Sequence, residues 1–195
     1  MPVTRGRPRA FDRDEALRRA TEVFWERGYE TASIAELTAA MGIRPPSLYA
    51  AFGDKRGLFD EVVAGYQAVA GPVMEESLAA PTAREALDRL LHALADDYTD
   101  PSHPPGCLVI SAAVNVADRD VRDSLRAARE ASKAAIAARI AADAEDLAEG
   151  TDPGELAAFY AAVVQGMSTQ ACDGASRAEL RAIAASAMRA WPARD

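Results

Sequence analysis

Residues 33–55 contain two short helical patterns separated by a glycine, and this arrangement constrains the fold more than any other feature of the chain. Ser33 and Glu36 have the spacing of a capping box, in which each side chain bonds to the other residue's backbone N–H at a helix start. Gly42 can end that helix in a left-handed conformation without a Cβ penalty. The Pro-Pro pair that follows cannot lie inside a helix, but either proline is tolerated in the first turn of a second one. The pattern therefore predicts a helix, a tight turn and a second helix.

The second predicted helix has an inner and an outer face. Leu48 and Phe52 lie one turn apart and are expected to face the core together, which leaves Arg44, Ser47 and Tyr49 on the outer side. In a helix-turn-helix the second helix enters the major groove of DNA. The same spacing also fits an ordinary pair of packed helices, so spacing alone leaves both interpretations open.

A short basic arm precedes these helices. Residues 1–9 contain Arg5, Arg7 and Arg9 ahead of any acidic residue. An Arg-Gly-Arg-Pro segment can lie in a narrow A·T-rich minor groove with its arginines inserted. The alternative is a solvated chain end without a binding role.

The first 60 residues carry a family resemblance. Gly28-Tyr29 follows the first predicted helix, and Leu48-Tyr49-x-x-Phe52-x-x-Lys55 follows the turn. This pattern resembles the N-terminal domain of the TetR/AcrR family of bacterial transcriptional regulators over residues 10–60. The resemblance implies an all-α fold, with a three-helix helix-turn-helix domain followed by a larger helical domain for ligand binding and dimerisation. The implied divisions are an N-terminal arm at 1–9, a DNA-binding domain at 10–56 and a ligand-binding and dimerisation domain at 57–195.

The resemblance also implies which residues contact DNA. By position, the matching residues are Ser33, Tyr49 and Lys55 for phosphates, and Arg44, Pro45 and Ser47 for the groove. Many relatives carry a histidine where this chain has Ala51, so we expect that backbone contact to be missing.

The distribution of charge agrees with DNA binding at the N-terminal end. Residues 1–60 contain ten Lys or Arg and nine Asp or Glu, a net charge of +1, whereas residues 61–195 contain twelve and twenty-one, a net charge of −9. Acidic charge thus belongs to the part expected to stand away from DNA, where salt would screen most of it. Without a membrane-spanning or secretion segment, and with two cysteines, the sequence predicts a cytoplasmic protein with reduced thiols.

Helical signals continue to the end of the chain, and no strand-like alternation interrupts them. The first predicted helix runs from a cap at Asp12 to about Arg27, the helix-turn-helix pair lies within residues 33–55, and a long helix runs from Lys55 to the upper seventies. Three further helices are predicted from about residue 82 to Tyr98, from Cys107 to Val116 and from Asp118 to about Ala148. The last two begin at Asp152 and Ser176.

The last two predicted helices carry broad apolar faces and small residues that allow close approach. In TetR-like proteins the corresponding helices pair with those of a second subunit. The resemblance therefore implies a homodimer interface, and the alternative is packing onto the chain's own core. The expected interface residues are Phe159, Val163, Gly166, Met167, Leu180, Ile183 and Ala187.

The central helices are expected to hold a small effector, mostly apolar or aromatic, that changes the spacing of the two recognition helices. The residues expected to line its pocket, each equally acceptable as a core residue, are Tyr66, Leu90, Leu94, Tyr98, Cys107, Ile110, Val114 and Phe159.

Cys107 suggests an alternative to a bound effector, namely a repressor that senses oxidants or electrophiles through this thiol. It lies at a predicted helix start, where free N–H groups stabilise a thiolate, and its context resembles that of cysteines that sense oxidants or electrophiles in some TetR-type regulators. The plainer interpretation is a small buried side chain. His103 lies nearby, but two histidines and two cysteines are a sparse ligand set, and we predict no metal.

No motif of an enzyme appears: the chain lacks a Walker-type loop, an HExxH motif, a nucleophile elbow and a dinucleotide fingerprint. We therefore predict a non-enzymatic regulator without a cofactor. Its expected partners are a palindromic double-stranded operator, a second copy of the chain and a small effector that releases a repressor. A helical small-molecule-binding dimer without DNA binding is the alternative from another class.

Overall fold

The computed structural model describes residues 11–194, and within them the chain is α-helical without a β-strand. The helices are α1 (Arg13–Thr31), α2 (Ile34–Met41), α3 (Pro45–Phe52), α4 (Lys55–Leu78), α5 (Ala83–Asp97), α6 (Leu108–Ser111), α7 (Arg119–Ala142), α8 (Pro153–Cys172) and α9 (Arg177–Arg189), with a 3₁₀ turn at Ala144–Asp146. None of these helices is both long enough and apolar enough to span a membrane.

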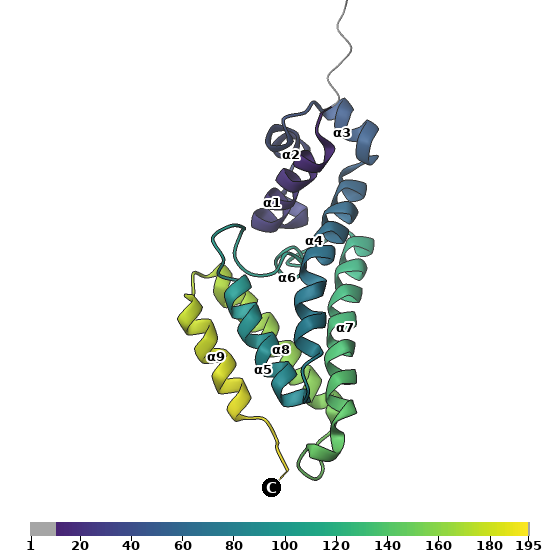
Figure 1. Ribbon diagram of the computed structural model, residues 1–195. Helices are drawn as coiled ribbons and strands as arrows, with labels where there is room; N and C mark the ends of the chain where they lie inside the picture. The colour runs from purple at the N-terminus through teal and green to yellow at the C-terminus, as the bar shows by residue number, and fades with distance from the viewer. Residues whose placement is uncertain (1–10, 195) are drawn as a thin grey trace, which may run out of the picture.

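The helices form an elongated molecule in which α1–α3 occupy one end (Figure 1). Helix α4 leaves that end and runs beside α7, while α5, α8 and α9 form the other end. Two apolar cores follow this division. The first joins α1–α4 to α6 and the start of α7, and the second joins α5, α8 and α9 to the end of α7. Because α6 and α7 contribute to the first core, the N-terminal helices pack directly on the rest of the chain.

The local signals around the first turn are confirmed. The Ser33 hydroxyl accepts a hydrogen bond from the Glu36 N–H, and the Glu36 carboxylate accepts one from the Ser33 N–H, so the capping box is complete. Gly42 ends α2 in the left-handed conformation at φ 67°. Leu48 and Phe52 are buried. Gly57 follows at the start of α4, where a Cβ atom would meet the Phe52 carbonyl oxygen, so the tight α3–α4 turn requires glycine.

Two helices are shorter than the sequence predicts. The helix expected over Cys107 to Val116 spans only Leu108–Ser111, since the chain turns and Asn115 adopts a left-handed φ of 56°. The helix expected to reach Ala148 ends at Ala142, because Asp143 leaves the helix. A third helix, α1, contains a break at Gly28, with φ 77° and ψ 170°, close to its predicted end.

Asp143 and Arg139 connect the end of α7 to the α4–α5 turn. The Asp143 carboxylate accepts a hydrogen bond from the Ala83 N–H and pairs with Arg139 at 2.9 Å. Arg139 also donates to the carbonyl oxygens of Ala80 and Pro81. The two charged side chains are only 14% and 21% exposed, so this pair is better shielded from water than a surface ion pair.

Asp143→Ala should lower the free energy of unfolding by about 1–3 kcal/mol, because it leaves the Ala83 N–H without its acceptor and Arg139 without its carboxylate partner. Arg139 holds the pKa of Asp143 below its usual value. This stabilisation is therefore complete above the unfolded-state pKa of about 3.9 and is lost as the pH falls further. Denaturant unfolding at neutral and acidic pH measures both effects. As a control, Asp123→Ala removes an exposed partner of Arg126 on the same helix and should cost less than about 1 kcal/mol; equal losses would contradict this assignment.

Candidate nucleic-acid interface and internal cavity

The outer face of α3 is open to solvent. Arg44 and Pro45 at its start are exposed, Tyr49 is 49% exposed and Ser47 is half-buried. Arg44 precedes the helix without capping it through its side chain, so its guanidinium is available for other contacts. The residues that the resemblance assigns to a DNA groove therefore lie together on an accessible surface, held by the buried Leu48 and Phe52 behind them.

Two of the expected phosphate contacts already have partners within the chain. The Lys55 ammonium donates to the Glu30 carbonyl at 3.3 Å and lies 4.5 Å from the centre of the Tyr29 ring. Partial burial there lowers the pKa of Lys55. The exposed Ser33 caps α2 through its hydroxyl. The other expected contacts in the arm, Arg5 and Arg7, lie outside the described residues.

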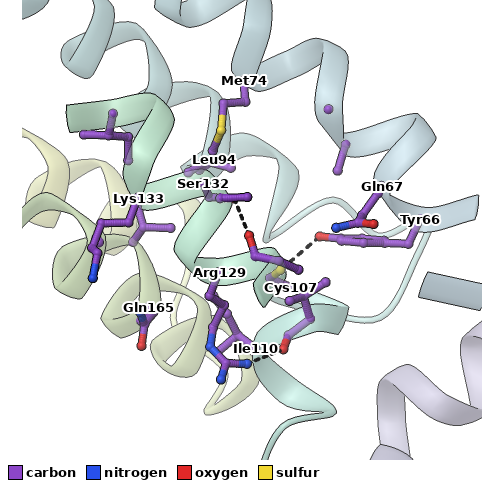
Figure 2. A pocket seen from close by; sticks show the side chains of 18 of the residues that line it. Tyr66, Gln67, Met74, Leu94, Cys107, Ile110, Arg129, Ser132, Lys133 and Gln165 are labelled. Atoms are coloured by element: carbon purple, nitrogen blue, oxygen red, sulfur yellow. Dashed lines mark hydrogen bonds between the residues drawn. The ribbon is translucent and has the colours of Figure 1, made fainter. Parts of the chain in front are cut away.

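A cavity of about 230 Å³, partly open to solvent, lies among α4, α5, α6, α7 and α8 (Figure 2). Five of the residues expected to line an effector pocket line this cavity, namely Tyr66, Leu94, Tyr98, Cys107 and Ile110. Its wall is mainly apolar, with polar side chains contributed by Gln67, Arg129, Ser132, Lys133 and Gln165.

Three residues expected in the pocket lie elsewhere. Leu90 is fully buried in the second core. Val114 is 66% exposed beside a separate groove between α1 and α8. Phe159 is 43% exposed on the outer face of α8 and α9. Helical periodicity gives the face on which a residue lies, but it does not tell which neighbour covers that face.

Helix α7 contributes to the cavity wall, which was not predicted from the sequence although a signal was present. Its inward stripe runs through Val121, Leu125, Ile136 and Ile140, all of them buried. Arg129 and Ser132 fall within that stripe at helical spacing and line the cavity. These two polar residues interrupt an otherwise apolar stripe, and this interruption could have predicted that α7 forms part of a cavity wall.

Cys107 and Tyr66 are joined by a hydrogen bond in the cavity wall. The Tyr66 hydroxyl donates to the Cys107 sulfur at 3.2 Å (Figure 2). Burial raises the pKa of the Cys107 thiol and outweighs the opposing effect of the Tyr66 hydroxyl and of the backbone N–H groups of α6. Burial therefore opposes a stabilised thiolate, which is one of the two interpretations of Cys107 that the sequence leaves open, and agrees with a small buried side chain. Among the described residues, no group of three His, Cys, Asp or Glu side chains is placed to hold a metal.

Aromatic contacts join the N-terminal helices to the cavity. Trp25 of α1 stacks on His103 with ring centres 4.9 Å apart and meets Tyr66 edge-on at 5.0 Å. The His103 ring lies 3.6 Å from the Asp97 carboxylate at the end of α5. Tyr66 therefore contacts both the cavity and α1.

The outer face of α8 and α9 is apolar, and no other part of residues 11–194 covers it. Phe159, Val163 and Ile183 line a shallow groove on it, and Gly166 is exposed nearby. Met167 and Leu180, also expected at an interface, are fully buried in the second core, and Ala187 is 6% exposed. Met167 and Leu180 belong to the inner sides of the same two helices, whereas Ala187, although mostly buried, borders the outer groove beside Ile183.

Two family models together match most of the chain. The model described as bacterial regulatory proteins, tetR family, matches residues 16–62. The model described as tetracyclin repressor-like, C-terminal domain, matches residues 83–188.

Characterised relatives match nearly the whole chain. The HTH-type transcriptional repressor ComR of Escherichia coli (strain K12) is 34% identical, covering 97% of this chain and 93% of its own. The repressor BdcR of the same organism is 33% identical, covering 93% and 90%. A cysteine-substituted form of the TetR family regulator CifR, solved with 26-bp double-strand operator DNA, is 49% identical with a TM-score of 0.89, covering 95% of this chain and 100% of its own.

The two thiols should differ in their reaction with iodoacetamide, which forms an S–C bond and releases iodide. Cys172 is exposed, whereas Cys107 is shielded and has a raised pKa. Cys172 should be alkylated first at pH 7, and the rate at Cys107 should rise with pH, since the thiolate fraction grows about tenfold per pH unit below the pKa. Peptide mass spectrometry over time measures both rates. Faster modification of Cys107 at pH 7 would contradict the environment described above.

Proposed function

Because this chain belongs to the TetR family of bacterial regulatory proteins, we propose that it represses transcription as a homodimer whose two α3 helices bind a palindromic operator. The observation that carries the proposal is the match at 49% identity to a regulator solved with operator DNA, together with the accessible face of α3. The chain acts as a DNA-binding regulator, and we assign it no catalytic role.

The uncovered α8–α9 face supports the homodimer. Two copies joined through Phe159, Val163 and Ile183 would bury an apolar surface that the single chain leaves open. A two-fold axis at this interface relates the two α3 helices. Recognition helices about 34–36 Å apart enter successive major grooves on one side of the duplex, which matches a palindromic site.

The cavity among α4–α8 supports release by a small effector. A molecule that binds there contacts Tyr66, which also touches Trp25 of α1. If the occupied cavity favours a different position of α1, operator affinity falls by the coupling free energy, typically about 1–3 kcal/mol.

Covalent modification of Cys107 is a second route to the same release. The observation that favours it is the position of the thiol in the cavity wall beside the Tyr66 hydroxyl. In Cys172→Ser protein, alkylation of Cys107 by iodoacetamide should then lower operator affinity. Unchanged affinity after complete alkylation would exclude this route.

Selection of random duplex DNA by the purified protein at two salt concentrations tests the proposed function. We expect recovery of one palindrome with half-sites about one helical turn apart and a steep loss of affinity with salt. Enrichment of no sequence would instead favour a helical dimer that does not bind DNA.

Substitutions in α3 and at the start of α4 should separate two kinds of contact. Lys55→Ala should weaken binding to all sequences alike and reduce the salt slope by about 1, whereas Arg44→Ala should change base preference by about 1–3 kcal/mol. Titration of the selected operator and of a single-base variant measures both. Arg89→Ala, an exposed substitution on α5 far from α3 in sequence and fold, is the control and should change neither. If both test variants bind the operator like the wild type, the proposal that this face contacts DNA is wrong.

A further inference from the structure

The charge of the cavity wall is opposite to that of the chain around it. The chain has 30 acidic and 22 basic residues, and the excess of acid falls after residue 60. The cavity lining nevertheless contains Arg129 and Lys133 and has no aspartate or glutamate among the described residues. A positive wall in an acidic domain indicates a ligand with negative charge.

Of these two cations, Arg129 lacks an acidic partner within the described part of the chain. Lys133 pairs with Glu130 at 2.6 Å, and Arg126 and Arg139 on the same helix pair with Asp123 and Asp143. The half-buried Arg129 has one hydrogen bond, from a terminal nitrogen to the Val109 carbonyl at 3.2 Å. That bond fixes the guanidinium at the cavity wall and leaves most of its N–H donors unused by residues 11–194.

The remaining donors suit a carboxylate. A guanidinium offers two parallel N–H groups that match the two oxygens of a carboxylate, and partial shielding from water strengthens such a pair. The rest of the wall suits an apolar body, since Met74, Leu94, Ile136 and Val164 line the same cavity. Figure 2 shows Arg129 and Ser132 projecting from α7, on the other side of Cys107 from Tyr66.

We propose that the cavity binds a small apolar carboxylate, with its hydrocarbon body against α4, α5 and α8 and its carboxylate paired with Arg129. This inference rests on the proposed function in one respect, namely that the cavity is the effector site. It adds the chemical class of the effector and the residue that selects it.

Three probes of equal chain length test the assignment, namely octanoate, 1-octanol and octylamine. Calorimetric titration of the full-length protein at pH 7.5 should give octanoate an affinity at least tenfold higher than that of 1-octanol, with octylamine the weakest of the three. Arg129→Gln should lower octanoate affinity to that of 1-octanol while leaving 1-octanol unchanged. Arg126→Gln, one turn closer to the start of α7 and outside the cavity lining, should retain the preference for octanoate.

Several results would overturn the assignment. Equal affinity for octanoate and 1-octanol would do so, and so would the failure of all three probes to bind. A loss of octanoate affinity of the same size in Arg126→Gln would show that general surface charge, and not Arg129, selects the anion. Thermal unfolding of each variant confirms that the comparison is made between folded proteins.

Operator titration with and without octanoate separates this inference from the proposed function. Arg129-dependent binding that leaves operator affinity unchanged would support the ligand class and contradict the effector role of the cavity. Release by 1-octanol as effective as release by octanoate would support the effector role and contradict the ligand class.

Discussion

The contact between Trp25 and Tyr66 is the constraint on which the arrangement of this protein depends. Trp25 belongs to the first helix of the DNA-binding end, yet it lies between Tyr66 of α4 and His103 of the α5–α6 loop. Its side chain is 8% exposed, and its indole N–H has no hydrogen-bond partner among the described residues. The contacts of the large ring on both sides therefore hold α1 against α4 and the α5–α6 loop.

Other contacts reinforce this junction between the DNA-binding helices and the rest of the chain. The Glu30 carboxylate at the end of α1 accepts hydrogen bonds from the N–H groups of Ala117 and Asp118, just before α7. The first apolar core includes Leu108 of α6 and Leu125 of α7 beside residues of α1–α4. A change in the position of α6 or α7 would therefore alter the surface on which α1 packs. Through these contacts, binding in the cavity could change the position of α3.

Much of the DNA-binding end could be predicted from sequence because its signals are local. The Ser33–Glu36 capping box, Gly42 and the Pro-Pro pair each act through neighbours within four residues, so they need no knowledge of the tertiary fold. The environment of Lys55 was not predictable in this way. Its contacts with Tyr29 and the Glu30 carbonyl come from residues about 25 positions earlier in the chain.

The cavity was only partly predictable, since several helices that are distant in sequence form it. Periodicity assigned Val114 and Phe159 to the pocket as apolar residues, but the structure turns both toward other surfaces. Periodicity did not identify Arg129 as a cavity residue. The role of a cation within an apolar stripe can be assigned only when the helices that face it are known. For the same reason, Met167 and Leu180 were wrongly expected at the dimer interface. They lie on the same helices as the proposed interface but face the second core.

The central claim is that the state of the cavity controls operator affinity, and a substitution that fills the cavity tests it without a ligand. Ala70 lies one turn from Tyr66 on α4 and lines the cavity, whereas Ala68 on the same helix is exposed and does not. The measurement is the affinity of Ala70→Phe for the selected operator. The account predicts a loss of about 5–150-fold, with wild-type affinity in Ala68→Phe. Wild-type affinity in a folded Ala70→Phe protein would contradict it.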